Sequence, residues 1–130
     1  MAEMLHCTVV TPEKSIFGAP ASRVTVPAHD GEVGILPGHA RLLAKLGNGE
    51  LRVTADGKTH SFYVEGGFLQ VAENRVTVLT DSAFAVQDVD VAAAERRVNE
   101  LREVGLGGEF AEARRRWLAR RRVKERFLRS

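Results

Sequence analysis

Hydrophobic and polar residues alternate over short stretches up to about Thr80, which is the period of a half-buried β-strand. The clearest stretches are residues 5–9, 23–26, 50–54, 59–64, 68–72 and 75–79. Pro27 closes the second of them. Asp56-Gly57 and Glu73-Asn74 each separate two neighbouring stretches and predict two β-hairpins, the first with a tight primed turn. Short strands with a turn every 8–12 residues favour an antiparallel sandwich or barrel over βαβ units.

The period changes after Gln87. Hydrophobic residues then recur at helical spacing at Val91, Ala94, Val98, Leu101 and Val104. Either Asp88 or Asp90 can cap the start of this helix, and the glycine-rich stretch 105–108 ends it.

A second helix is predicted over residues 109–127. Phe110, Ala113, Trp117 and Leu128 share one face, which Arg121 and Lys124 interrupt. The chain is thus expected to divide into a β-sandwich, 1–86, and a helical hairpin, 87–130.

The seam of this hairpin is expected to be weak. It joins Val98 and Leu101 of the first helix to Trp117 of the second, and most of its residues are small. Like charges also repeat at i,i+4 along the second helix, as at Arg116 and Arg120, which is mildly unfavourable. A weakly held hairpin with a glycine-rich joint is able to open, and the sequence leaves both the folded-down and the extended state available.

Composition narrows the class of protein. With 130 residues, 44% hydrophobic and 28% charged, the chain is expected to be one soluble domain with a small appendage rather than a disordered protein. It contains no apolar run long enough to span a membrane and no signal-peptide pattern at its start. One cysteine gives no disulfide framework, so a cytoplasmic setting is expected.

Charge is distributed unevenly. Residues 109–130 carry nine basic and three acidic side chains, +6 in all, whereas residues 1–108 carry −4. The basic segment indicates an acidic partner, which can be a protein, a nucleic acid or an anionic membrane. For nucleic acid, residues 114–116 and 120–122 supply phosphate contacts, but no row of aromatic residues offers base stacking. A membrane-surface helix is less favoured because its apolar face is broken.

Catalytic chemistry is hard to find in the sequence. Cys7 lies on an alternating strand and is interpreted as a small buried hydrophobe. The four histidines form no pair at metal-ligand spacing, so no metal site is expected. Residues 30–40 stand out for their three glycines and one proline. They are interpreted either as two turns around a short strand or as a rigid loop that presents Glu32 and His39 to a partner.

Four segments carry a resemblance to a known family: residues 31–40 (GEVGILPGHA), 66–71 (GGFLQV), 76–79 (VTVL) and 87–90 (QDVD). The chain resembles the epsilon subunit of bacterial and chloroplast F-type ATP synthases. The first segment is the most specific, and the likeness is weakest from Leu106 onward. It implies a β-sandwich of about ten strands followed by a two-helix hairpin, with no catalytic residue.

The resemblance also implies partners and a role. The subunit is expected in the central stalk of a proton-translocating synthase, docked on the gamma subunit and the c-ring through Glu32 and His39. The complex lies on the cytoplasmic face of a bacterial cell membrane, so membrane contact is expected only through it. The extended hairpin is expected to restrain ATP hydrolysis when Arg115, Arg116, Arg121 and Arg122 meet an acidic segment of the catalytic beta subunits.

One departure from the family concerns ATP. Some members bind it through a motif of Ile or Leu, Asp, two free positions, Arg and Ala. Here the stretch is residues 89–94 (VDVAAA), so Ala93 stands where the arginine is expected. Asp90 is retained and Arg96 lies one turn on, a poor substitute. No cofactor is therefore expected.

Overall fold

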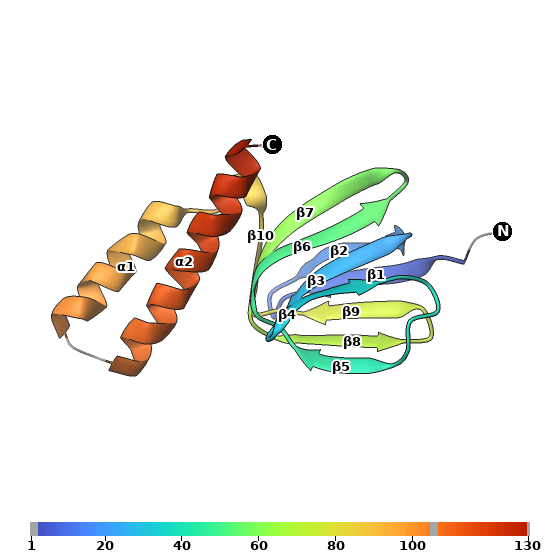
Figure 1. Ribbon diagram of the computed structural model, residues 1–130, viewed down its shortest axis with the longest axis horizontal. Helices are drawn as coiled ribbons and strands as arrows, with labels where there is room; N and C mark the ends of the chain where they lie inside the picture. The colour runs from blue at the N-terminus through green and yellow to red at the C-terminus, as the bar shows by residue number, and fades with distance from the viewer. Residues whose placement is uncertain (1–2, 105–106, 130) are drawn as a thin grey trace.

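Two five-stranded sheets followed by two helices form the protein (Figure 1). The computed structural model describes residues 3–104 and 107–129. Sheet A has the order β2-β1-β9-β8-β5, and sheet B the order β10-β7-β6-β3-β4. The strands are β1 (Leu5–Val10), β2 (Ser15–Ala21), β3 (Arg23–Ala28), β4 (Gly31–Ile35), β5 (Leu42–Lys45), β6 (Asn48–Ala55), β7 (Lys58–Glu65), β8 (Phe68–Ala72), β9 (Arg75–Leu79) and β10 (Ser82–Ala85). The predicted sandwich with a helical hairpin after it is confirmed.

Both predicted β-hairpins are present. Asp56 and Gly57 have φ of 52° and 73° between β6 and β7, and Glu73 and Asn74 have φ of 51° and 60° between β8 and β9. Two successive residues with positive φ make the primed turn that matches the twist of the flanking strands. Gly67 is also required, because a Cβ there would overlap the carbonyl oxygen of Leu79.

Two details differ from the sequence prediction. β1 pairs in parallel with β9, so the sandwich is not wholly antiparallel. A period of two tells which residues face the core but not the direction of the neighbouring strand. Pro27 lies inside β3 rather than closing it. It is tolerated because β6 pairs only with residues 23–25 of β3, so Pro27 needs no donor on that side.

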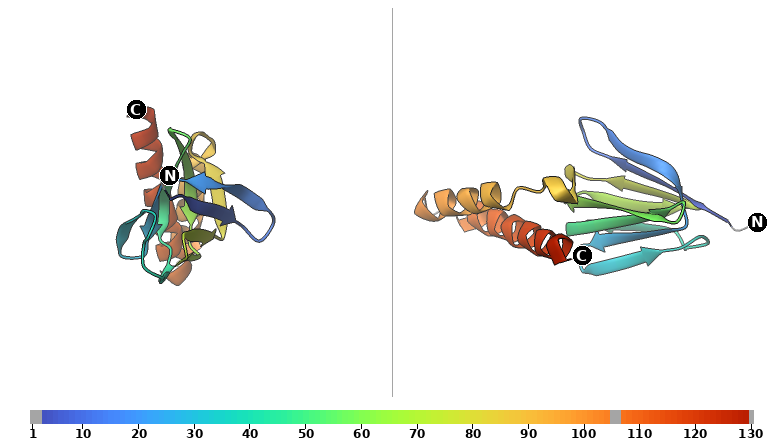
Figure 2. Two further views of the ribbon diagram at one scale, coloured as in Figure 1. Left: turned by 90° about the vertical axis from the view of Figure 1, so that its right-hand side faces the viewer. Right: turned by 90° about the horizontal axis from the view of Figure 1, so that it is seen from above.

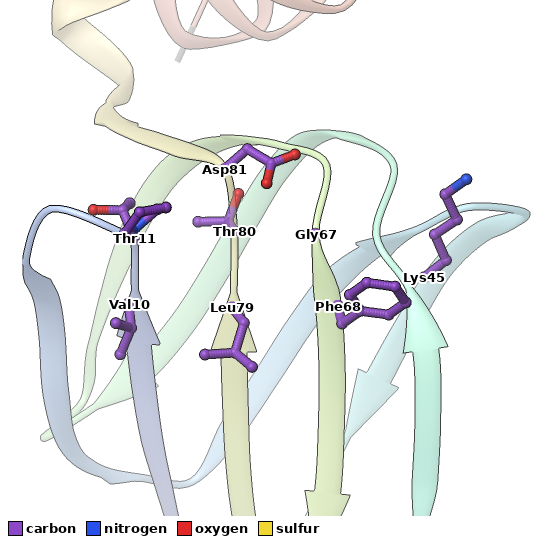
Figure 3. A pocket seen from close by; sticks show the side chains of 9 residues that line it. Val10, Thr11, Lys45, Gly67, Phe68, Leu79, Thr80 and Asp81 are labelled. Atoms are coloured by element: carbon purple, nitrogen blue, oxygen red, sulfur yellow. The ribbon is translucent and has the colours of Figure 1, made fainter.

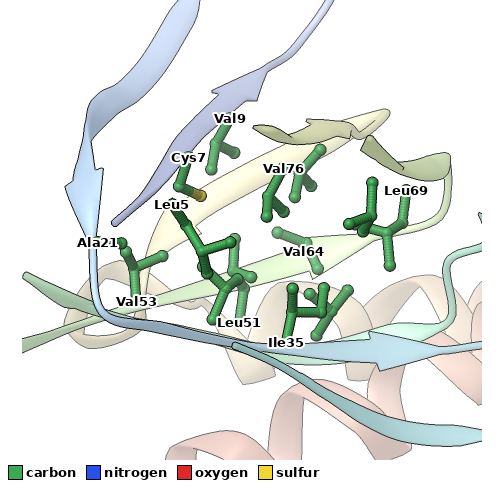
Figure 4. Packing of buried hydrophobic residues seen from close by; sticks show 14 of the residues in the cluster. Leu5, Cys7, Val9, Ala21, Ile35, Leu51, Val53, Val64, Leu69 and Val76 are labelled. Atoms are coloured by element: carbon green, nitrogen blue, oxygen red, sulfur yellow. The ribbon is translucent and has the colours of Figure 1, made fainter. Parts of the chain in front are cut away.

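The main core lies between the sheets, as Figure 4 shows. It is made of aliphatic residues that alternate with outward-facing ones, among them Leu5, Val9, Val24, Leu51, Val64, Leu69 and Val76. Cys7 is completely buried there, and burial raises the pKa of its thiol to about 12. The interpretation of Cys7 as a buried hydrophobe is confirmed.

The helical hairpin lies at one end of the sandwich (Figures 1 and 2). A 3₁₀ turn, η1 (Val86–Asp88), leads into α1 (Val91–Val104), and α2 (Gly107–Arg129) returns toward sheet B. Asp90 caps α1, since its Oδ1 accepts a hydrogen bond of 2.9 Å from the backbone N–H of Ala93.

The second helix is longer than predicted at both ends. Gly107 and Gly108 belong to α2 instead of separating the helices, while Gly105 and Leu106 lie outside the described residues. Within residues 3–104 and 107–129, neither helix is long and apolar enough to cross a membrane.

Candidate functional site

The helix α2 has two contact faces, and the first packs on α1. Val98, Leu101 and Ala113 form a small buried cluster, with Phe110 and Trp117 packed against it. The structure thus brings the three predicted seam residues together. Leu128, expected on the same face, is 71% exposed because it lies beyond the reach of α1. The indole Nε1 of Trp117 is buried without a hydrogen-bond partner among the described residues, an unfavourable feature of the seam.

The second face of α2 packs on sheet B and was missed by the sequence analysis. Ala119 and Val123 are buried against Tyr63, Val86 and Val89. Ala119 precedes Arg120, Val123 lies between Arg122 and Lys124, and both side chains are small, so their pattern gave no signal. This second cluster attaches the hairpin to the sandwich.

A buried ion pair lies beside this cluster. The guanidinium of Arg120 donates to both carboxylate oxygens of Glu65, from Nη2 to Oε1 at 2.8 Å and from Nε to Oε2 at 3.1 Å. The hydroxyl of Tyr63 donates to Oε2 at 2.8 Å. The side chain of Glu65 is 7% exposed and that of Arg120 19%. A bidentate pair in this setting is both strong and geometrically specific.

Neighbouring groups hold the Arg120 guanidinium in place. Its Nη1 donates to the carbonyl of Asp90 at 3.4 Å, and the group lies over the rings of Tyr63 and Phe84 at 5.9 and 5.7 Å. Hydrogen bonding to Glu65 raises the pKa of Arg120 above its ordinary value, although desolvation opposes this. Burial and then the Glu65 charge raise the pKa of Tyr63, so its hydroxyl remains a donor.

Further polar contacts join the C-terminal part of α2 to η1 and to β6 of sheet B. Lys124 Nζ donates to the carbonyl of Gln87 at 2.6 Å, and Arg126 lies 3.9 Å from Glu50. Arg52 links Glu50, at 2.9 Å, to Glu32, at 3.2 Å. The α2 helix is therefore joined to sheet B by charges as well as by apolar packing.

Glu32 and His39 do not form one site. Glu32 is exposed near the start of β4, at the end of the sandwich that faces the hairpin. His39 lies in the turn after β4, where the N–H of Gly38 donates to Asn74 Oδ1 at 2.7 Å. Their segment is a strand between two turns, the first of the two interpretations of its sequence.

The predicted inhibitory arginines are all exposed on α2. Arg116 pairs with Glu112 at 2.8 Å and Arg121 with Glu125 at 3.7 Å, both within the helix. Arg115 and Arg122 form no ion pair with any described residue. Because exposed pairs of this kind contribute little free energy, all four side chains can meet a partner.

The expected nucleotide residues are placed apart. Asp90 caps α1, and Arg96 is exposed and does not line the small depression between the helices. That depression is about 150 Å³ and is lined by Ala93, Ala94, Arg97, Ala113, Arg116 and Arg120.

A depression of about 520 Å³ lies on the outer face of sheet A near the hairpin (Figure 3). Val10, Leu79, Phe68 and Lys45 are register partners across four strands and line it. Leu79 and Phe68 are 48% and 54% exposed. Leu43, two residues before Lys45, extends this apolar face and is 74% exposed. An exposed row of large apolar residues is typical of a protein-binding surface.

No group of three or more His, Cys, Asp or Glu residues that could hold a metal ion occurs in the part of the chain that the structure describes. The features described above are contact surfaces and a charged latch between two parts of the chain.

Comparison with known proteins agrees with this description. Residues 4–86 match the family model of the ATP synthase delta/epsilon chain β-sandwich domain. The ATP synthase epsilon chain of Nitratidesulfovibrio vulgaris strain DP4 is 37% identical over 95% of this chain and 98% of its own length.

Two solved structures share the fold. A chain in the Euglena gracilis mitochondrial ATP synthase (OSCP/F1/c-ring, rotational state 1) has a TM-score of 0.67 at 22% identity, covering 93% of this chain and 73% of that one. A chain in the central stalk/c-ring of the Tetrahymena thermophila enzyme has a TM-score of 0.57 at 18% identity, covering 85% of this chain and 96% of that one.

Proposed function

The chain belongs to the family of ATP synthase epsilon chains, non-catalytic subunits of the synthase, and on that premise we propose that it couples the gamma subunit to the c-ring and restrains ATP hydrolysis through α2. In this proposal the subunit is peripheral, on the cytoplasmic face of a bacterial cell membrane, in a proton-translocating complex. The observation that carries the regulatory part is a basic helix attached to the sandwich by one small apolar cluster and by polar contacts centred on the Arg120–Glu65 pair.

Inhibition follows from the charge of α2. Its exposed arginines, Arg115, Arg116, Arg121 and Arg122, are suited to an acidic segment of the catalytic beta subunits. In the folded-down hairpin this helix lies against the sandwich, so it reaches such a segment only after release. The seam with α1 is small and leaves the Trp117 N–H unpaired, which lowers the free energy needed for release.

Docking is assigned to two surfaces of the sandwich. The apolar face of sheet A, with Leu79, Phe68 and Leu43, is suited to the gamma subunit, because its burial would remove large exposed hydrophobic side chains from water. Glu32 is exposed and shares Arg52 with Glu50, so it is free to turn toward the polar loops of the c-ring. His39 is assigned to a contact with gamma or the ring at the other end of β4.

Nucleotide is not assigned to this chain. Ala93 stands in place of the arginine of the family's ATP motif, and Arg96 is not among the residues that line the depression between the helices. Arg97, Arg116 and Arg120 do reach that depression, but Arg120 is already bonded to Glu65. We therefore expect no ATP binding at cellular concentrations, and calorimetric titration of the isolated chain with ATP is the check.

The alternative function, nucleic-acid binding through the basic helix, predicts salt-dependent binding of the isolated chain to DNA. Binding to duplex DNA would weaken steeply with salt because phosphate contacts release counterions. A titration of the isolated chain with DNA at 50 and 200 mM salt distinguishes the two functions. We expect no binding at either salt concentration, whereas binding at 50 mM that weakens at 200 mM would favour the nucleic-acid function.

Charge reversal tests the inhibitory proposal. Replacing Arg115, Arg116, Arg121 and Arg122 by Glu is expected to raise the ATP hydrolysis rate of the reconstituted complex, more at low salt, where screening is weak. Lys14→Glu and Lys58→Glu, exposed on the sandwich, form the matched control and should leave the rate unchanged. Equal rates for all chains at every salt concentration would remove the inhibitory role.

A further inference from the structure

Glu65 is an unusual residue for the outer face of a sheet. It ends β7 and points to the same side as Tyr63, away from the main core, yet both are buried. They are buried because α2 covers them. A carboxylate in this position loses its water and needs a cation in return, which Arg120 supplies from 55 residues away.

Arg120 differs from the other arginines of α2. Arg116 and Arg121 pair with acids on their own helix, so those pairs survive any movement of the hairpin. The pair of Arg120 with Glu65 joins helix to sandwich and must break when α2 leaves. Release therefore frees one more arginine, immediately beside Arg121 and Arg122.

We propose that Glu65 competes with the acidic partner of α2 for Arg120. Glu65 binds Arg120 in the folded-down hairpin, and Arg120 becomes available to that partner when α2 is released. The inference rests on the proposed inhibitory function for the identity of the partner. The Glu65–Arg120 pair between helix and sandwich, which we call the latch, does not depend on that function. Glu65 offers Arg120 the same two carboxylate oxygens that an acidic segment would offer. The competition sets how much of the hairpin is released.

The latch is tested in the isolated full-length chain by thiol labelling. Cys7 is buried in the main core and should not label in the folded sandwich. A thiol introduced by Ala119→Cys lies on the face of α2 that packs on the sandwich, so its labelling rate reports release of α2. Glu65→Gln and Arg120→Gln should each label about tenfold faster, because each removes charge-assisted hydrogen bonds between helix and sandwich. Glu73→Gln, which breaks the exposed pair with Arg41, is the matched control and should not change the rate.

Two further controls keep this measurement interpretable. The thiol introduced by Leu128→Cys, at an exposed position, gives the intrinsic labelling rate. Unfolding of each variant by urea checks that the sandwich remains folded. An unchanged labelling rate at position 119 in both latch variants would overturn the latch.

The competition is tested in the reconstituted complex. Glu65→Gln should lower ATP hydrolysis below that of the unchanged chain, because Arg120 is then available to the partner. Arg120→Gln releases the hairpin equally but lacks the arginine, so its hydrolysis rate should exceed that of Glu65→Gln. A complex without α2 is measured in parallel. If removal of α2 raises ATP hydrolysis but Glu65→Gln and Arg120→Gln give equal hydrolysis rates, the competition is overturned. If removal of α2 has no effect, the inhibitory function fails, and the labelling experiment still decides the latch.

Discussion

At the scale of single residues, Trp117 shows how a side chain can contribute area and still be poorly satisfied. Its ring packs on the α1–α2 seam beneath Arg121, whose guanidinium is 5.3 Å from the ring centroid, while Nε1 has no partner among the described residues. The seam is thus held by apolar burial alone at its largest residue. Truncation of the whole ring of Trp117 and removal of its N–H alone should therefore have different effects on the stability of the hairpin.

Trp117→Ala is expected to destabilise the hairpin by about 2 kcal/mol, below the cost for a fully buried aromatic residue, since the ring is half-buried. Trp117→Phe keeps most of the packing and removes the unpaired N–H, so it should be nearly neutral. Hydrogen exchange of α1, a helix too short to persist alone, measures both. Loss of protection throughout the sandwich in Trp117→Ala would contradict a separable hairpin.

Cys7 predicts a pH dependence of stability. Burial raises the pKa of its thiol from 9.0 to about 12, so the folded state holds this proton more tightly than the unfolded state. Its contribution is complete below pH 9 and is lost as pH rises toward 12, at about 1.4 kcal/mol per pH unit. Urea unfolding of the unchanged chain and Cys7→Ala at pH 8 and 10 isolates this slope, because Tyr63 is present in both. Parallel pH profiles would show that the thiol is not the cause.

At the scale of elements, the strands and helices follow from local pattern, but the contacts of α2 do not. Periods of two and 3.6 predicted six of the strands and both helices, and Asp56-Gly57 predicted a turn that the backbone dihedrals confirm. The attachment of α2 depends on Ala119, Val123 and Arg120, whose partners lie in β7 and η1. Nothing within one helix reveals a partner 55 residues away. The parallel pairing of β1 with β9 is likewise a property of the whole chain path.

The outer face of sheet A is the element-scale prediction. Phe68→Ser together with Leu79→Ser should weaken co-purification with the gamma subunit at least about tenfold, because aromatic and large aliphatic residues at the centre of an interface dominate its affinity. Stability should change by no more than about 0.5 kcal/mol for each exposed position. Met4→Ser, 43% exposed, is the control and should retain gamma. Full retention by the double variant would place the gamma contact elsewhere.

Glu32 is predicted to contact the c-ring. A thiol introduced by Glu32→Cys should form a crosslink with a thiol placed in a polar loop of the ring in the assembled complex, since Glu32 is exposed and bonded only to Arg52 among the described residues. A thiol introduced by Lys58→Cys, at the exposed start of β7, is the control. A crosslink at position 58 but none at 32 would reverse the assigned orientation of the sandwich.

At the scale of the whole molecule, the described residues form one large hydrophobic cluster and two small ones. The core between the sheets contains no helix residue, whereas the cluster around Tyr63 joins α2 to the sandwich and the cluster around Val98 joins α1 to α2. The +6 segment from residue 109 contacts the rest of the chain through Ala119 and Val123, the Glu65–Arg120 pair, and the polar contacts of Lys124 and Arg126, besides its seam with α1. This division supports the proposal that the subunit assembles through the sandwich and regulates through the hairpin.

The ATP hydrolysis rate of the complex reconstituted with the full chain or with residues 1–105 tests this division most directly. The shortened chain keeps the main core, so it should fold, assemble and support ATP synthesis. Hydrolysis should be faster with the shortened chain, because no basic helix remains to meet the catalytic beta subunits, and the difference should shrink at high salt. Equal hydrolysis rates at all salt concentrations, with assembly intact, would contradict the account.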